Sequence, residues 1–171
     1  MFKIIGITGL VISCGLIGVN QKQKLNMRIR LLEDYYQMVI SLKGNISYFK
    51  EPITDVFNRA SKNSRFKAHS LLKAIECDSN NKHIEIPQIW SKNVLLIYNN
   101  CPVTKKDIEV MSYLGNFIGQ TDYSNQLQHF EYLESNIKLQ IQNAKDELHS
   151  KGPMYNKIGY FVGAIIGIIL I

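Results

Sequence analysis

The side chains that most often bind metals or act as nucleophiles are scattered along this 171-residue chain. Its four histidines show neither HxxxH nor HxxE spacing, so no helical face gathers a set of metal ligands. They are His69, His83, His129 and His149. We expect them to be surface or capping residues.

The three cysteines are an odd number without CxxC spacing, which argues against a disulfide framework or a zinc site and favours a reducing compartment. They are Cys14, Cys77 and Cys101. The chain also lacks a GxxxxGK phosphate loop and a GxSxG nucleophile turn. Adjacent acids, such as Asp146 and Glu147, point to different helical faces and indicate solvated charge. We therefore predict no catalytic residue, no metal and no cofactor.

Binding is the remaining kind of function, and the basic residues are the first candidates for it. No acidic residue lies between Val56 and Ile75, and this stretch supplies much of the net charge of +6. Its cluster comprises Arg59, Lys62, Arg65, Lys67 and Lys73. A solvated face, an acidic protein partner and anionic lipid are open alternatives. Nucleic acid is disfavoured, because no recognition motif accompanies the cluster.

The elements that would position such a surface begin and end with hydrophobic segments. Residues 4–19 and 158–171 are mainly apolar, and about 20 apolar residues suffice for a transmembrane helix. We predict an N-terminal transmembrane anchor over residues 1–20, a cytoplasmic domain over 21–152 and a C-terminal transmembrane segment over 153–171. A cleaved signal peptide, a lipoprotein box ending at Cys14 and a buried C-terminal core helix are the alternatives.

Flanking charge predicts the orientation of these segments. Lys and Arg residues follow the first segment and precede the second, which places the middle domain in the cytoplasm by the positive-inside rule. Within the second segment Gly159, Gly163 and Gly167 recur every four residues and leave room for another helix to pack closely.

The middle domain has the apolar periodicity of helices. Apolar residues recur every seven positions in two series, first Leu25, Leu32, Val39 and Ile46, then Tyr35, Leu42 and Phe49. A last long helix, to about Ser150, carries Phe130, Ile137 and Ala144 at the same interval. Packing against neighbouring helices explains these seams better than a parallel coiled-coil dimer. The long first and last helices imply an antiparallel pair.

Shorter helices are expected between these two. Pro52 starts a short second helix, a third covers residues 64–77, and Pro87 starts a fourth that carries Trp90. Thr104 and Asp107 resemble a capping box ahead of a fifth helix over residues 108–119. Gly115 and Gly119, one turn apart, leave room for a close neighbour. The predicted fold class is all-α, an antiparallel bundle of about six helices flanked by N- and C-terminal transmembrane helices.

Several segments together resemble the stage III sporulation protein AB family of endospore-forming bacteria, over essentially the whole chain. They are the two hydrophobic ends, residues 41–48, the Glu51-Pro52-Ile53 tripeptide, Trp90, Leu114-Gly115, residues 118–122 and Gln126. Asn45, Ile53 and Ile118 depart from the pattern expected for the family, and Asn45 argues against an indispensable charge at that position.

The resemblance implies a helical domain like that of the platform protein F of type II secretion systems. It also implies a non-enzymatic scaffold in a transenvelope complex, located in the mother-cell membrane facing the forespore. Its expected partners are a secretion-type ATPase, stage III sporulation protein AA, further stage III proteins, the lipid membrane and, as an open alternative, further copies of itself. The basic cluster is the first candidate for ATPase contact, and Asp122 with Gln126 the second. A membrane-tethered adaptor outside sporulation is the competing function.

Overall fold

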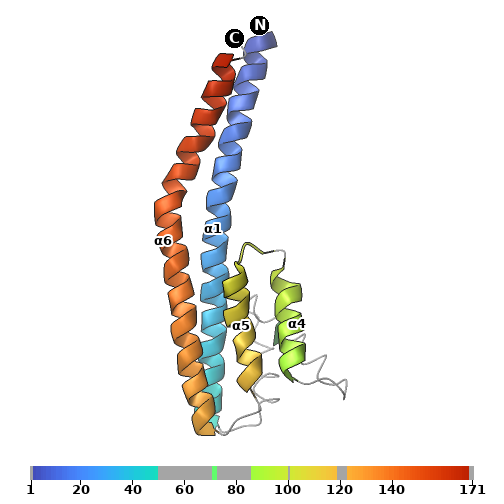
Figure 1. Cartoon of the computed structure of the whole chain (residues 1–171), viewed down its shortest axis with the longest axis vertical. Coiled ribbons are helices and arrows are strands. Elements are labelled where there is room, and N and C mark those ends of the chain that lie inside the picture. The colour runs from blue at the N-terminus through green and yellow to red at the C-terminus, as the bar shows by residue number, and fades with distance from the viewer. Residues whose placement is uncertain (1, 50–70, 73–85, 100, 119–122, 170–171) are drawn as a thin grey trace. The chain divides into compact units, whose positions relative to one another are not determined.

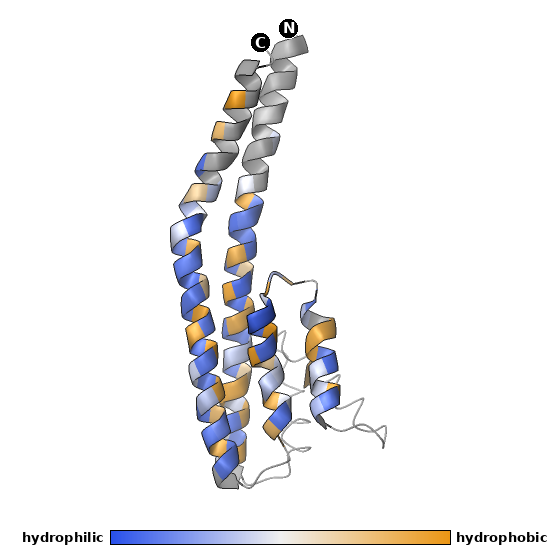
Figure 2. Cartoon of the chain, in the orientation of Figure 1, coloured by the Kyte–Doolittle hydropathy of each residue, from blue (hydrophilic) through white to orange (hydrophobic). Residues whose placement is uncertain are grey.

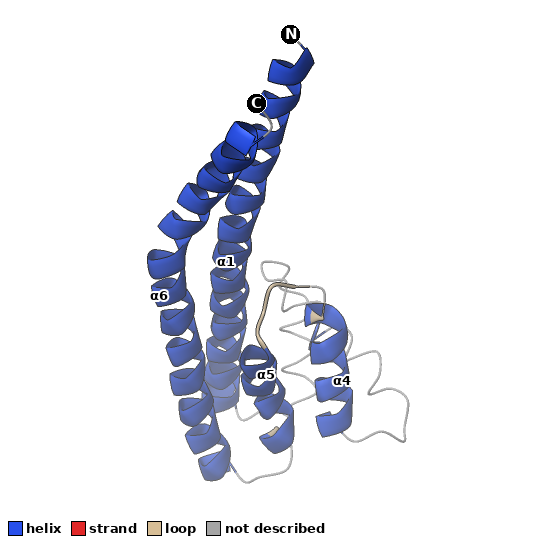
Figure 3. Cartoon of the chain, turned by 45° about the horizontal axis from the view of Figure 1, so that its top comes forward, coloured by secondary structure: helices blue, strands red, loops and turns tan. Residues whose placement is uncertain are grey.

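The computed structural model describes residues 2–49, 71–72, 86–99, 101–118 and 123–169. Every regular element within these ranges is a helix (Figure 3). The helices are α1 (Phe2–Phe49), α4 (Ile86–Tyr98), α5 (Lys105–Phe117) and α6 (Tyr123–Ile169), labelled in Figure 1. The all-α prediction is therefore confirmed.

The chain divides into two compact units, and α1 and α6 contribute to both. The first unit contains Met1–Ile29 and Gln142–Ile171, and the second contains Arg30–Ile141. Within the first, Lys22 lies beside Gly152 and Arg28 beside Glu147, so the two helix segments run antiparallel. In the coloured parts of both long helices, hydrophobic and hydrophilic residues alternate (Figure 2), as expected for helices buried on one side.

The core of the second unit follows the predicted seven-residue seams. Leu32, Tyr35, Val39, Leu42 and Ile46 of α1 are buried, and so are Phe130, Ile137 and Ile141 of α6. The same seams continue into the first unit, where Ala144 is buried and Leu25 is half-buried. From α4 and α5 the core receives Ile89, Trp90, Val94, Met111, Leu114 and Phe117. The periodicity of the sequence thus identified the buried faces correctly.

One backbone carbonyl holds three helices of this core together. The Met111 carbonyl oxygen on α5 accepts a hydrogen bond from the Tyr35 hydroxyl on α1 at 2.6 Å and from Trp90 Nε1 on α4 at 2.9 Å. Burial raises the pKa of Tyr35 well above its ordinary value, and nearby Tyr98 adds to the effect. The neutral phenol is therefore the form that donates this bond.

Gly115 permits α4 and α5 to approach as closely as they do. A Cβ at this position would lie 2.5 Å from the Trp90 Cβ and 2.7 Å from its Cγ. Carbon atoms prefer separations of about 3.5 to 4.0 Å, so no side chain fits without moving the indole. The predicted close approach at Gly115 is confirmed, whereas Gly119 lies outside the described residues.

The start of α5 confirms the predicted capping box. The Thr104 backbone N–H donates to Asp107 Oδ2 at 2.7 Å, and the Asp107 N–H donates to Thr104 Oγ1 at 3.2 Å. The helix begins at Lys105, three residues before the predicted Ile108, because the cap lies at Thr104. At the other end, the Ile118 N–H donates to the Leu114 carbonyl at 3.3 Å.

The predicted fold class is wrong in the number of helices. Within the described ranges the chain forms four, not about six. The expected first anchor and first bundle helix are one continuous helix, α1, and the last bundle helix continues through Pro153 to Ile169 as α6. Leu71 and Leu72 are helical and buried, while the rest of the predicted second and third helices lies outside the described residues.

The predicted transmembrane helices are also not part of the observed fold. In the described part of the chain, no helix sustains an apolar run of the length that a bilayer crossing requires. The predicted domain boundaries after residues 20 and 152 fall within continuous helices and stay predictions.

Candidate partner-binding surface

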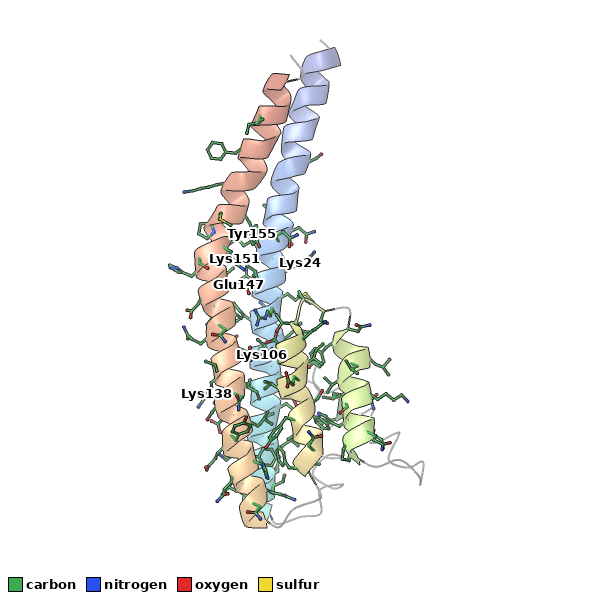
Figure 4. The ribbon with its side chains drawn as sticks, in the orientation of Figure 1. Lys24, Lys106, Lys138, Glu147, Lys151 and Tyr155 are labelled. Carbon is green, nitrogen blue, oxygen red and sulfur yellow. The ribbon has the colours of Figure 1, made fainter. Side chains whose placement is uncertain are left out.

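A cavity of about 220 Å³ opens between α5 and α6 in the second unit. We call this site the α5–α6 groove. Its walls contain both apolar and charged side chains, and Lys106 on its rim is labelled in Figure 4. The lining residues are Lys106, Glu109, Val110 and Tyr113 of α5 with Tyr132, Leu133 and Asn136 of α6.

Helical spacing explains why these residues share one groove. The four from α5 lie three, four and seven positions along the chain from the first, which places them on one face of the helix. Leu133 is buried at the floor, whereas Tyr132 is 59% exposed on the flank of α6. The groove is thus an apolar floor between flanks that carry charge and aromatic surface.

Aromatic contacts fix the register of the two helices below the groove. The Tyr113 ring lies 5.3 Å from the Tyr132 ring, and the Phe117 ring lies 5.1 Å from both His129 and Phe130. Tyr113 Oη lies 2.7 Å from His129 Nδ1. Partial burial and the neighbouring Tyr132 raise the pKa of Tyr113.

His129 differs from its prediction as a surface or capping residue. It is half-buried and stacked on Phe117, where it helps to hold α5 against α6. The sequence around His129 gave no sign of this role, because its partners Tyr113 and Phe117 lie on α5. Among the described side chains, no three His, Cys, Asp or Glu residues come together as metal ligands.

Beside the groove, Glu134 links α6 to α1. Tyr36 donates a hydrogen bond to Glu134 Oε1 at 3.0 Å, Lys43 Nζ donates to Oε2 at 3.3 Å, and Lys138 Nζ donates to Oε1 at 3.0 Å. Lys138 also lies 5.5 Å from the centroid of the Tyr36 ring. The bond from Lys138, with those from Tyr36 and Lys43, lowers the pKa of Glu134 even though partial burial opposes the shift.

The lowered pKa of Glu134 predicts a pH-dependent contribution to stability. A carboxylate whose pKa is lower in the folded state stabilises the fold above its unfolded pKa, about 4.3, and loses this contribution as the pH falls through the folded pKa. We expect the wild type to lose more stability than Glu134→Gln between about pH 5 and about pH 3. Urea unfolding at both pH values tests this.

Glu131→Gln is the matched control, because this carboxylate is 63% exposed and lies 3.7 Å from the same Lys43 Nζ. It should follow the wild type closely. If Glu134→Gln were as acid-sensitive as the wild type, the Glu134 network would contribute nothing to folding.

In the first unit an ion pair joins α1 and α6. Arg28 Nη1 lies 2.8 Å from Glu147 Oε2, and the two side chains are only 7% and 29% exposed. Lys151 Nζ lies 2.7 Å from the other oxygen of Glu147. Figure 4 labels Glu147 and Lys151 on α6. Glu147 was predicted to be solvated charge, so this part of the prediction is wrong.

The structure places few of the predicted binding residues. Gln126 lies on α6 and is half-buried. Gly159, Gly163 and Gly167 also lie on α6, but what they contact is outside the described residues. The remaining candidates are outside the described residues altogether; they are Arg59, Lys62, Arg65, Lys67 and Asp122.

The groove residues were not predicted from the sequence. Lys106 lies between Thr104 and Asp107 of the predicted capping box, and neither it nor Tyr132 had an assigned role. A usable signal exists in Tyr132 and Leu139, two large apolar residues seven positions apart that fall off the buried seam of α6.

Comparison with known proteins gives consistent results. A family model described as stage III sporulation protein AB matches residues 3–171. A curated relative, stage III sporulation protein AB of Bacillus subtilis (strain 168), is 17% identical over 170 residues, which is 99% of each chain. A solved structure of a stage III sporulation protein AB has a TM-score of 0.63 at 16% identity, covering 71% of this chain and 96% of that one.

Proposed function

Because the chain belongs to the stage III sporulation protein AB family, we propose that it is a non-enzymatic scaffold of a secretion-like transenvelope complex required for endospore formation. The family match over residues 3–171 is the observation that carries this proposal. The family is described as a sporulation protein and not by an enzymatic activity. The family membership therefore supports a role in sporulation, and the scaffold role is our proposal.

The proposed action is to couple a cytoplasmic ATPase, stage III sporulation protein AA, to membrane partners at the mother-cell membrane facing the forespore. The resemblance to platform protein F supports this proposal, because such proteins work next to an ATPase. Buried seams and interhelical hydrogen bonds hold the helices together, and such a rigid domain suits a protein that couples two partners. Exposed charge would then determine which partner is bound.

The basic cluster is our first candidate for ATPase contact. Replacing Arg59, Lys62, Arg65 and Lys67 together with Gln should leave helicity unchanged and weaken recovery of the ATPase in a pull-down. Long-range attraction between opposite charges decays within about 8 to 10 Å at physiological salt, so the difference from the wild type should shrink as salt is added.

A variant in which Lys22, Lys24, Lys92 and Lys157 become Gln removes the same charge elsewhere and serves as the control. All four side chains are exposed. Equal recovery of the ATPase by both variants and the wild type would show that the basic cluster does not make the contact. Asp122 and Gln126 would then be tested next.

Loss of heat-resistant spores on deletion of the gene, restored by the wild-type gene, tests the sporulation role itself.

A further inference from the structure

Two exposed apolar side chains lie on α6, Tyr132 in the lining of the α5–α6 groove and Leu139 three residues beyond Asn136 of that lining. Tyr132 and Leu139 are 59% and 51% exposed, and their spacing of seven residues places them on one face of α6. Clustered exposed apolar surface commonly marks an interaction site. Among the residues that the structure describes, none covers this face, which leaves it available to a partner.

The groove also carries two opposite charges on α5 that could pair with the same two charges of a second, antiparallel copy. Lys106 and Glu109 lie three positions apart on the exposed side of α5. No ion pair within the described ranges involves either of them. If a second α5 ran antiparallel across this one, each Lys106 would face a Glu109.

The apolar residues have the same symmetry on α6. Asn136 lies between Tyr132 and Leu139, so an antiparallel second α6 centred near Asn136 would place each Leu139 over a Tyr132. Asn136 lines the same cavity as Lys106 and Glu109, so the charged pair and the centre of the apolar pair belong to one groove. One twofold axis through this groove would relate both pairs to their counterparts in a second copy.

We infer that the α5–α6 groove binds a second copy of this chain through a twofold-symmetric contact. Such isologous contacts use the same patch on both subunits. Leu139 of each copy enters the cavity of the other, beside Tyr132 and above Leu133. The cavity of about 220 Å³ is large enough, since one of about 150 Å³ accommodates benzene. This inference concerns self-association and holds whether or not the ATPase binds.

The symmetry provides a charge-exchange test on the full-length chain. In a dimer of Lys106→Glu, the new carboxylate of each copy faces Glu109 of the other, so two repulsive contacts form. In a dimer of Glu109→Lys, the new ammonium group of each copy faces Lys106 of the other, with the same result. Each variant should raise the dimer dissociation constant about tenfold or more in sedimentation velocity. An equimolar mixture of the two variants restores opposite charges at both positions and should recover dimers near the wild-type level.

Leu139→Glu should abolish the dimer, because it replaces an apolar contact with Tyr132 and Leu133 by a carboxylate that would lose its hydration in the interface. Leu96→Glu is its matched control, since Leu96 is 64% exposed on α4 and away from the groove. It should leave the dimer unchanged. Circular dichroism confirms that each variant retains its helices.

A wild-type chain that stays monomeric at its highest soluble concentration overturns the inference. So does a dimer that survives Leu139→Glu, or a mixture of the two charge variants that remains as weak as each alone. If the chain is monomeric but Leu139→Glu prevents recovery of another sporulation protein, the groove binds a helix of that partner instead, and the self-association is wrong.

Discussion

Replacing Gly115 with leucine should lower the free energy of unfolding by about 3 kcal/mol, the upper end of the range of about 1 to 3 kcal/mol that is typical of overpacked cores. The first added atom would already lie 2.5 Å from the Trp90 Cβ, which is attached directly to the α4 backbone. The indole cannot rotate away without breaking the bond from its Nε1 to the Met111 carbonyl. Urea unfolding followed by circular dichroism measures the loss.

Gly44→Ala is the matched control, because Gly44 lies in the interior of α1 and an added Cβ would meet no atom within 4 Å. Alanine should stabilise this position by about 0.5 to 1 kcal/mol, since it costs less conformational entropy than glycine in a helix. If Gly115→Leu had the same unfolding midpoint as the wild type, α4 and α5 would have to be able to separate without loss. The close contact at Trp90 would then be unimportant for the fold.

The buried faces of the long helices could be predicted because they depend on local spacing. A seven-residue repeat of apolar residues returns to nearly the same helical face every two turns, whatever lies opposite it. Leu32, Val39 and Ile137 were identified in this way and are buried. The capping box at Thr104 and Asp107 is also local, since both partners lie within four residues of each other.

Helix boundaries were less predictable, because a proline disfavours the continuation of a helix without forbidding it. Pro153 has no N–H to donate and crowds the carbonyl four residues earlier, which normally ends or kinks a helix. The structure nevertheless continues α6 from Tyr123 to Ile169. The change from polar to apolar composition near residues 20 and 153 likewise suggested separate elements where the backbone is continuous.

The groove and the Met111 carbonyl could not be predicted, because each combines residues that are distant in sequence. Tyr35, Trp90 and Met111 lie on three different helices, and nothing in one helix specifies which carbonyl the other two will reach. The ion pair of Arg28 and Glu147 gave a fainter signal. Arg28 lies seven residues before Tyr35, so it continues the buried seam of α1 with a charged side chain. A buried charge is costly unless an opposite charge lies beside it.

That ion pair leads to an asymmetric prediction for its two members. Removing one partner of a fully buried pair costs about 3 to 5 kcal/mol, because the other charge is left buried without compensation, so the cost depends on how buried the remaining charge is. Glu147→Gln takes away the negative charge facing the buried Arg28 guanidinium, and we expect a loss of about 2 kcal/mol because Glu147 is itself 29% exposed. Arg28→Met should cost far less, since Glu147 keeps its bond from Lys151 and contact with water.

Urea unfolding of the full-length protein distinguishes the two variants, with Lys151→Met as the control for an exposed partner. Lys151 is 48% exposed, and solvent screens such a pair, so this variant should lie close to the wild type. Equal losses for Glu147→Gln and Arg28→Met would show that the pair acts as a solvated surface contact. A larger loss for Arg28→Met would mean that the packing of the arginine side chain, and not its charge, holds α1 against α6 in this unit.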